Sequence, residues 1–290
     1  MKHKEESIWG LFLVPIGKLI EWKTIMIDTY EDYQHINRLG WAQGVSKGWK
    51  ATSTFGTKEL QHSKDLLDPN NWIPWEKVKS VLCLASGGGQ QGPLFASLGY
   101  NVTVVDFSPE QLAQDQQVAD EHGFKIELIE SDILDLSLLY GRHFDLVYQP
   151  LSAHHVPDVR HVYREVVKVL SPNGYYFVSH WNPIFFQLPL SDESVQWDGK
   201  AYRLVRAQKS GELVHCKWET DNGDKIAICH FIHTLSDLIG GLCDLGFVIH
   251  HFDEPKGGNR CADPESLEHI ASFFPLTFNI FCSKPQTWMK

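Results

Sequence analysis

The sequence lacks the features that would point to a membrane or to a nucleic acid. No apolar stretch among its 290 residues approaches the ~20 residues that span a bilayer, so we expect no membrane span. Basic residues are scarce: 26 Lys or Arg stand against 36 Asp or Glu, the net charge is −10, and no Lys/Arg run occurs. Because phosphate contacts supply most of the affinity for nucleic acids, we expect none as a partner.

Cysteine pairs with redox or metal-binding spacing are also missing. None of the six cysteines sits in a C-x-x-C pair or has a Cys or His partner at zinc-finger spacing. In a chain of this length we therefore expect reduced, mostly buried thiols. The apolar run at 8–16 is followed by charged residues instead of a small-x-small cleavage site. We expect a soluble, cytoplasmic protein, and the sequence does not indicate its oligomeric state.

Hydrophobic residues make up 43% of the chain, enough for a sizeable core. In residues 77–183, short runs rich in β-branched residues alternate with helical patterns, which favours a doubly wound α/β fold with a parallel sheet covered on both faces. The expected strands are 81–84, 102–105, 126–129, 144–148 and 175–178, with helices near 90–98, 109–122 and 158–170.

The flanking segments differ from this core. Residues 1–76 are rich in aromatic residues, and we predict short helices there around 28–38 and 57–67. After Pro183 the pattern changes to that of a small β-rich insertion. We expect insertion strands at 202–207, 213–219 and 225–231, then a helix at 236–245 and strands at 247–252 and 276–281. The predicted parts are a helical and aromatic cap (1–76), a cofactor-binding core (77–183), a substrate-covering insertion (184–232) and the last part of the core sheet (233–290).

A glycine-rich turn follows the first core strand. Glycines 87, 88 and 89 separate this strand from the next helix, so the backbone can turn sharply and approach a ligand closely. Asp106 ends the following strand, at about the spacing at which an acid binds ribose hydroxyls. Gly87-x-Gly89-x-x-Gly92 matches the dinucleotide fingerprint, whereas Ala85-x-Gly87-x-Gly89 has the glycine spacing of S-adenosylmethionine (SAM) loops.

The rest of the core separates these two possibilities. Ser131-Asp132-Ile133 follows the third strand, 144–150 forms the fourth, and 164–174 leads into the fifth. In this order the set resembles the class I SAM-dependent methyltransferases, especially small-molecule enzymes related to the ubiquinone/menaquinone type. The resemblance implies a mostly parallel, seven-stranded, Rossmann-like sheet with an antiparallel C-terminal strand, covered by an N-terminal helical lid and the insertion.

Two positions depart from that family. Cys83 stands where the family usually carries an acid that helps to hold the loop and the methionine amino group of the cofactor, and Ala85 stands where it usually carries glycine. We expect Gln90, Gln91 or backbone carbonyls to replace the acid.

The resemblance also implies a set of cofactor-binding residues. Ala85, Ser86, Gly87 and Gly89, with Gln90, would line the methionine moiety, and Asp106 would bind the ribose. Phe107 would flank the adenine, Asp132 and Ile133 would hold its far edge, and Gln149, Pro150 and Leu151 would lie beside the sulfonium. Without a ligand, Asp106 would be a solvated acid at a strand end, and Asp132 would cap a helix over 133–139.

His154 and His155 are the candidate catalytic residues. They lie just beyond the fourth strand, where an imidazole could deprotonate a phenol or hydroxyl, although they could instead be surface or capping histidines. Cys229-His230-x-x-His233 and His250-His251 could suggest a metal, but neighbouring residues on a strand point to opposite faces. We predict no metal site.

The sequence thus predicts methyl transfer from SAM to a small apolar or aromatic acceptor at oxygen, nitrogen or a carboxylate, releasing S-adenosylhomocysteine. Aromatic residues of 181–218 could roof the acceptor pocket or simply seat the insertion on the sheet. One alternative is an NAD(P)- or FAD-dependent oxidoreductase that uses the Gly87–Gly92 fingerprint. Another is a catalytically inactive binding subunit with the same fold.

Overall fold

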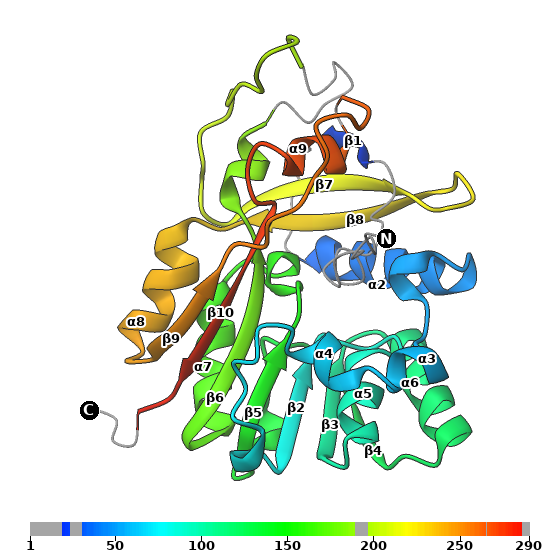
Figure 1. Cartoon of the computed structure of the whole chain (residues 1–290), viewed down its shortest axis with the longest axis vertical. Helices are drawn as coiled ribbons and strands as arrows, with labels where there is room; N and C mark the ends of the chain where they lie inside the picture. Colours follow the sequence, from blue (N-terminus) through cyan, green and yellow to red (C-terminus); the bar gives the residue numbers. More distant parts are fainter. Residues whose placement is uncertain (1–18, 24–30, 189–196, 265, 286–290) are drawn as a thin grey trace, which may run out of the picture.

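The computed structural model describes residues 19–23, 31–188, 197–264 and 266–285. A seven-stranded sheet in the order β4-β3-β2-β5-β6-β10-β9 forms the base of the molecule, and a three-stranded sheet in the order β1-β7-β8 lies across its upper end (Figure 1). The strands of the large sheet are β2 (Ser80–Leu84), β3 (Asn101–Asp106), β4 (Ile126–Glu130), β5 (Phe144–Gln149), β6 (Leu170–Trp181), β9 (Val248–Asp253) and β10 (Thr277–Ser283).

Strand directions in the large sheet match the expectation from the sequence. Strands β2 to β6 run parallel, and β10 runs antiparallel to both β6 and β9. Along β2, Leu82 and Leu84 belong to one hydrophobic core, and Val81 and Cys83 to another on the opposite face. The near-continuous apolar runs of the sequence reflect this burial on both sides.

Helices cover the two faces. Residues of α4 (Ser63–Leu67), α5 (Gln91–Ser97) and α6 (Pro109–His122) pack on one face, and those of α7 (Val159–Val169) and α8 (Gly241–Asp244) on the other. Helix α6 matches its predicted bounds because both ends carry strong signals: the Ser108 side chain caps its first turn, and Gly123 ends it with φ of 71°.

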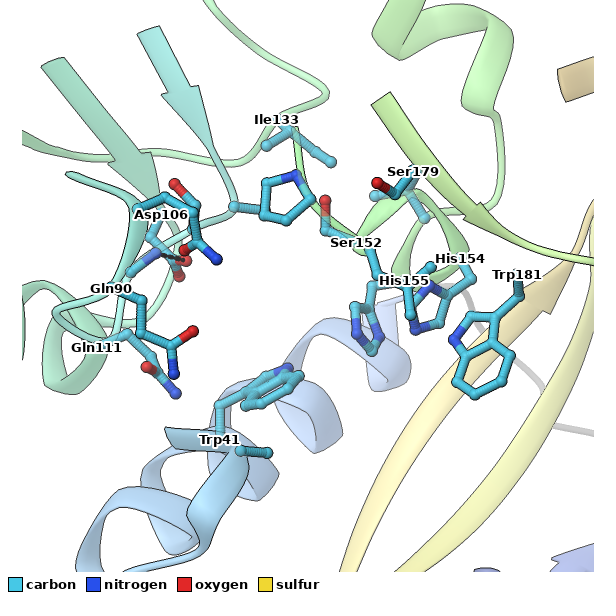
Figure 2. A pocket seen from close by; sticks show the side chains of 18 of the residues that line it. Trp41, Gln90, Asp106, Gln111, Ile133, Ser152, His154, His155, Ser179 and Trp181 are labelled. Atoms are coloured by element: carbon cyan, nitrogen blue, oxygen red, sulfur yellow. Dashed lines mark hydrogen bonds between the residues drawn. The ribbon is translucent and has the colours of Figure 1, made fainter. Parts of the chain in front are cut away.

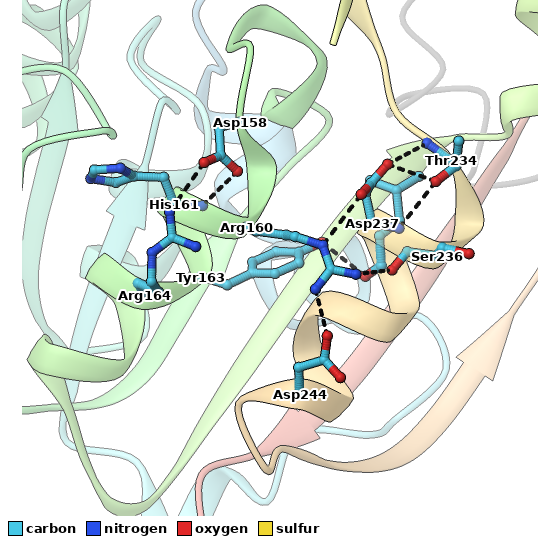
Figure 3. Close-up of polar contacts among 10 residues, drawn as sticks. Asp158, Arg160, His161, Tyr163, Arg164, Thr234, Ser236, Asp237 and Asp244 are labelled. Atoms are coloured by element: carbon cyan, nitrogen blue, oxygen red, sulfur yellow. Dashed lines mark hydrogen bonds and ion pairs between the residues drawn. The ribbon is translucent and has the colours of Figure 1, made fainter. Parts of the chain in front are cut away.

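Helix α7 is tied to the segment that follows the small sheet. The Arg160 guanidinium donates to Asp237, to Asp244 (2.5 Å) and to the Ser236 carbonyl (2.6 Å) (Figure 3). Burial would raise the pKa of Asp237, but hydrogen bonds from Ser210 and Thr234, together with Arg160, lower it to about 2. The charged network thus fixes the turn that leads back into the large sheet.

Helix α2 (Glu31–Ser46) links the small sheet to the large one (Figure 1). The small sheet consists of β1 (Leu19–Lys23), β7 (Glu212–Glu219) and β8 (Lys225–Ile232). On α2, the Asn37 side chain donates to the Cys229 carbonyl (3.1 Å) and accepts from the Cys229 N–H (2.6 Å). At Gly40, a Cβ atom would lie 2.4 Å from the Ala227 carbonyl oxygen, so only glycine allows this close packing of helix on strand.

Four predicted elements differ from the structure. The helix expected at 28–38 runs from Glu31 to Ser46, with 28–30 outside the described residues, and the one expected at 57–67 is two short helices, α3 (Thr57–Leu60) and α4. The helix expected at 236–245 is a π-helical turn, η6 (Ser236–Gly240), followed by α8. The strand expected at 202–207 is wrong: Leu204 and Val205 are more than half exposed, and the segment pairs with no strand in the described part of the chain.

The remaining short elements are η1 (Lys50–Thr52), η2 (Trp75–Lys77), η3 (Ser137–Leu139), η4 (Ala153–His155), η5 (Pro183–Gln187) and α9 (Leu267–Ala271). None of the six cysteines, all of which are described, forms a disulfide, and Cys243 and Cys261 are the exposed ones. Within the described part of the chain, no helix is long and apolar enough to cross a bilayer.

Candidate functional site

A large cavity lies between the carboxyl ends of β2, β3 and β5 and the cap made by α2 and β8. At one end it is lined by Asp106, Gln90 and Gln111, and at the other by His154 and His155 (Figure 2). The residues predicted to bind a cofactor that line it are Ala85, Ser86, Gly87, Gln90, Asp106, Phe107, Asp132, Ile133, Pro150 and Leu151.

Two of the predicted cofactor residues do not line the cavity. Gly89 (φ of 71°) faces α6, where a Cβ would lie 2.8 Å from Thr54 and 3.0 Å from Val118. The Gln149 side chain is fully buried, where it accepts from the Tyr176 hydroxyl and donates to Ser152. Gly89 therefore shapes the turn, and Gln149 braces the end of β5.

The glycine turn is held by acids from two other elements. The Gly87 N–H donates to Asp106 (2.9 Å), and the Gly88 N–H donates to Asp115 of α6 (2.9 Å). A Cβ at Gly87 would lie 2.7 Å from the Gln111 Cβ, so glycine is required where the turn meets α6. Asp115 thus holds the loop, one of the two tasks of the acid that is missing at Cys83. Gln90 and Gln91, two of the expected substitutes, both line the cavity, and the Gln90 amide also donates to the Ser53 carbonyl beside the cap.

Asp106 is a buried carboxylate with several hydrogen-bond donors, and it forms no ion pair with any residue that the structure describes. Its second oxygen accepts from the Ser108 N–H (2.9 Å). Burial raises the pKa of Asp106 to about 6, although the backbone donors of Ser108 and Gly87 lower it. Burial similarly raises the pKa of Asp115 to about 8. Each carboxylate oxygen of Asp106 has lone pairs to spare, so hydroxyl donors of a ligand would stabilise its charged form.

Helix α2 closes the outer side of this end of the cavity. The Gln34 side chain donates to Asp132 (2.7 Å), and the Arg38 guanidinium lies 5.9 Å from the centre of the Phe107 ring. Asp132 also accepts from the Leu134 N–H (2.9 Å) in a local turn, and the described helical turn nearby begins only at Ser137. The helix that Asp132 was alternatively expected to cap is therefore absent from 133–136.

Three histidines meet at the far end of the cavity. His154 and His155 come from the turn η4, and His230 comes from β8; their ring centres are 4.0 to 5.0 Å apart. The nearest ring nitrogens of all three lie within 4.8 Å of one another. Burial lowers the pKa of His155 to about 4, although a hydrogen bond to the Cys229 carbonyl raises it. Burial also holds the pKa of His154 well below its usual range. Burial likewise holds the pKa of His230 well below its usual range, so all three imidazoles are neutral near pH 7.

Sequence reasoning missed His230 as part of this group. It grouped His230 with His233, but His233 contacts the Ala153 carbonyl (3.1 Å) and is not one of the cavity-lining residues. Because side chains alternate along β8, His230 points toward the cavity. Its contact with His154 and His155 of η4 depends on tertiary packing, which the local sequence does not indicate.

The walls between the two ends are mostly aromatic and aliphatic. Tyr148 and Phe177 stack with ring centres 4.6 Å apart, and one polar pair, Ser179 and Asn279, interrupts this surface. Other apolar side chains in the lining include Trp41, Trp49, Leu66, Leu67, Trp181, Trp218 and Ile228. A planar apolar molecule would fit such walls, with polar contacts available at the ends and at the Ser179–Asn279 pair.

Comparison with known proteins gives a consistent picture. A family model described as a methyltransferase domain matches residues 82–178. An uncharacterized methyltransferase of Bacillus subtilis, YbaJ, is 36% identical over 194 residues, which cover 66% of this chain and 74% of that protein.

Solved structures share the fold. A SAM-dependent methyltransferase from Mesorhizobium loti aligns with a TM-score of 0.56 and 22% identity, over 78% of this chain and 100% of that one. A Burkholderia thailandensis 1,6-didemethyltoxoflavin N1-methyltransferase, with its acceptor and S-adenosylhomocysteine bound, aligns with a TM-score of 0.52 and 13% identity over 90% and 92% of the two chains.

Proposed function

Because this chain belongs to the class I SAM-dependent methyltransferases, we propose that it methylates a small apolar or aromatic molecule at oxygen, nitrogen or a carboxylate. The carrying observation is the continuous cavity that joins the glycine turn to the aromatic walls and the histidines. The Burkholderia neighbour, which binds a small acceptor beside S-adenosylhomocysteine, supports an acceptor of this size.

The polar end of the cavity fits the cofactor. When bound, SAM supplies an electrophilic methyl group on its sulfonium. We assign Ala85, Ser86, Gly87 and Gln90 to its methionine part and Asp106 to its ribose, since the buried carboxylate needs donors that two hydroxyls can provide. Phe107, Asp132 and Ile133 would enclose the adenine, and Pro150 and Leu151 would lie beside the sulfonium.

The histidine end fits the acceptor. Methyl transfer is an in-line displacement, so the protein mainly orients the acceptor and excludes water, which the apolar walls do. His154 and His155 present neutral imidazoles at the reactive end, and we assign to them the activation of a hydroxyl or phenol. A carboxylate acceptor would arrive ionised and would need only positioning.

An assay of S-adenosylhomocysteine release over a panel of phenols, aromatic carboxylates and heteroaromatic N–H compounds tests the proposal. On the accepted phenol, His154→Gln and His155→Gln should each lower turnover by at least about 100-fold, the lower end of general acid–base effects, with S-adenosylhomocysteine affinity unchanged. The control is His250→Gln on β9, away from the cavity. Wild-type turnover in both cavity variants would contradict the assignment.

A further inference from the structure

The three histidines form a set whose atoms converge on one point. The nearest nitrogens of His154, His155 and His230 lie within 4.8 Å of one another. Two nitrogens on one tetrahedral zinc ion, each at ~2.0–2.1 Å from it, lie roughly 3.3 Å apart. Small rotations of the rings would therefore bring all three within bonding distance of one ion. From these contacts we infer that His154, His155 and His230 bind a divalent transition metal, with zinc as the natural occupant.

The surroundings of the cluster support coordination. The His155 Nδ1 lies 3.3 Å from the Cys229 carbonyl, which fixes this nitrogen as the donor and leaves Nε2 for a metal. Such an outer hydrogen bond accompanies nearly all metal-ligating histidines. Trp41 packs against His155 and Trp181 against His154, edge to face in both cases, which limits the swing of these two imidazoles.

The charge balance indicates what the ion would take as its fourth ligand. Among the described residues that line the cavity, the acids are Asp106 and Asp132, both of which we assigned to the cofactor. Three neutral imidazoles leave the full double charge of the ion uncompensated, and a catalytic zinc keeps one position open beside three protein ligands. An anionic oxygen of the acceptor, such as a phenolate or carboxylate, fits that position.

This assignment of the acceptor rests on the proposed function, whereas metal binding itself does not. A phenol that replaces water on the ion would lose its proton to solvent, because the ion lowers the pKa of an oxygen bound to it. The resulting phenolate would be held facing the methyl donor. The histidines would then activate the acceptor through the ion, without taking up the proton themselves.

Cobalt(II) titration tests the site without an acceptor. Tag-free, chelator-treated protein should bind one equivalent of Co²⁺ and show the visible absorption bands of four-coordinate cobalt, and Zn²⁺ should displace it. His230→Gln and His155→Gln should each lose at least about 100-fold in affinity, more than loss of an outer-shell partner usually costs. His250→Gln, on exposed β9, should bind as the wild type does.

Binding of S-adenosylhomocysteine, measured on the same samples, shows that each variant is folded. The metal site would be overturned if the wild type showed no cobalt bands. It would also be overturned if His230→Gln and His155→Gln bound cobalt with the affinity of the wild type. If turnover persists in that case, the proposed function stands and the histidines act directly. If cobalt binds as predicted but no panel compound is methylated, the metal site stands and the acceptor class is wrong.

Discussion

Asp115 holds the glycine turn, although the family resemblance places the acid that holds this loop at position 83. It accepts the Gly88 N–H from α6, while Cys83, at the usual position of the loop acid, is fully buried in β2. Burial, reinforced by the nearby Asp115, raises the pKa of the Cys83 thiol, so it stays neutral. A carboxyl group at position 83 would put a second buried acid beside Asp115, and burial would disfavour its charged form as it does that of Asp115. The neutral thiol at Cys83 and the acid at Asp115 are therefore linked: with the acid on α6, the neighbouring position on β2 is occupied by an uncharged residue.

At the same scale, the pKa of Asp106 predicts a pH dependence of cofactor affinity. With a pKa of about 6 in the free protein, the carboxyl is ionised at pH 7 and increasingly protonated below pH 6. Ribose hydroxyls donate to the ionised form, so binding requires loss of that proton. Affinity for S-adenosylhomocysteine should therefore fall as the pH drops below 6, approaching tenfold per pH unit. Calorimetric titrations from pH 5 to pH 8 measure this.

Asp106→Asn provides the control for that experiment. Its amide oxygen can still accept from the Gly87 or Ser108 N–H, but it does not titrate. The variant should bind more weakly at pH 8 and lose the slope below pH 6. An unchanged slope would assign the titration to another group.

Among the elements, α2 joins the two halves of the site. Its Gln34 and Arg38 contact Asp132 and Phe107 at the cofactor end, while its Trp41 packs against His155 at the other. The helix also packs on β8, where Asn37 donates to the Cys229 carbonyl and Gly40 lies close to the backbone. The placement of this helix therefore depends on how tightly it packs on β8.

Gly40→Ala tests that dependence. The added methyl group would lie 2.4 Å from a backbone oxygen that cannot move aside cheaply, so the helix must shift. The free energy of unfolding should fall by about 1–3 kcal/mol, the usual cost of overpacking, and urea unfolding followed by circular dichroism measures it.

Gln43→Ala, on the exposed side of the same helix, is the matched control and should change stability by no more than about 0.5 kcal/mol. A Gly40→Ala protein as stable as the wild type would show that α2 does not rely on this contact.

The elements differ in how far the sequence could predict them. The core strands were predictable because burial on both faces leaves a continuous apolar run, as in β2. The segment 202–207 also contains strand-forming residues, but among the described residues it pairs with no strand, so its backbone gains no ladder hydrogen bonds. Strand β1 was not predicted, because its pairing partner, β7, lies almost two hundred residues further along.

In the whole molecule, the two ends of the cavity also differ in how far the sequence could predict them. The cofactor end is built at the carboxyl ends of adjacent parallel strands, so its residues, from Ala85 to Leu151, follow from the order of the strands. The acceptor end is assembled from α2, η4, β6, β8 and β10, whose contacts are set by tertiary packing. His230 and Asn279 therefore could not be identified from local sequence.

We propose that this cavity binds SAM at its polar end, with Asp106 on the ribose. The most direct test is calorimetric titration of the wild type and of Asp106→Ala with S-adenosylhomocysteine, with NAD(H) and NADP(H) as controls. The wild type should bind one equivalent with micromolar affinity, the variant should bind at least about tenfold more weakly, as the loss of a charged hydrogen bond predicts, and neither should bind the nicotinamide cofactors. Equal affinities of the two proteins, or binding of a nicotinamide cofactor alone, would contradict the account.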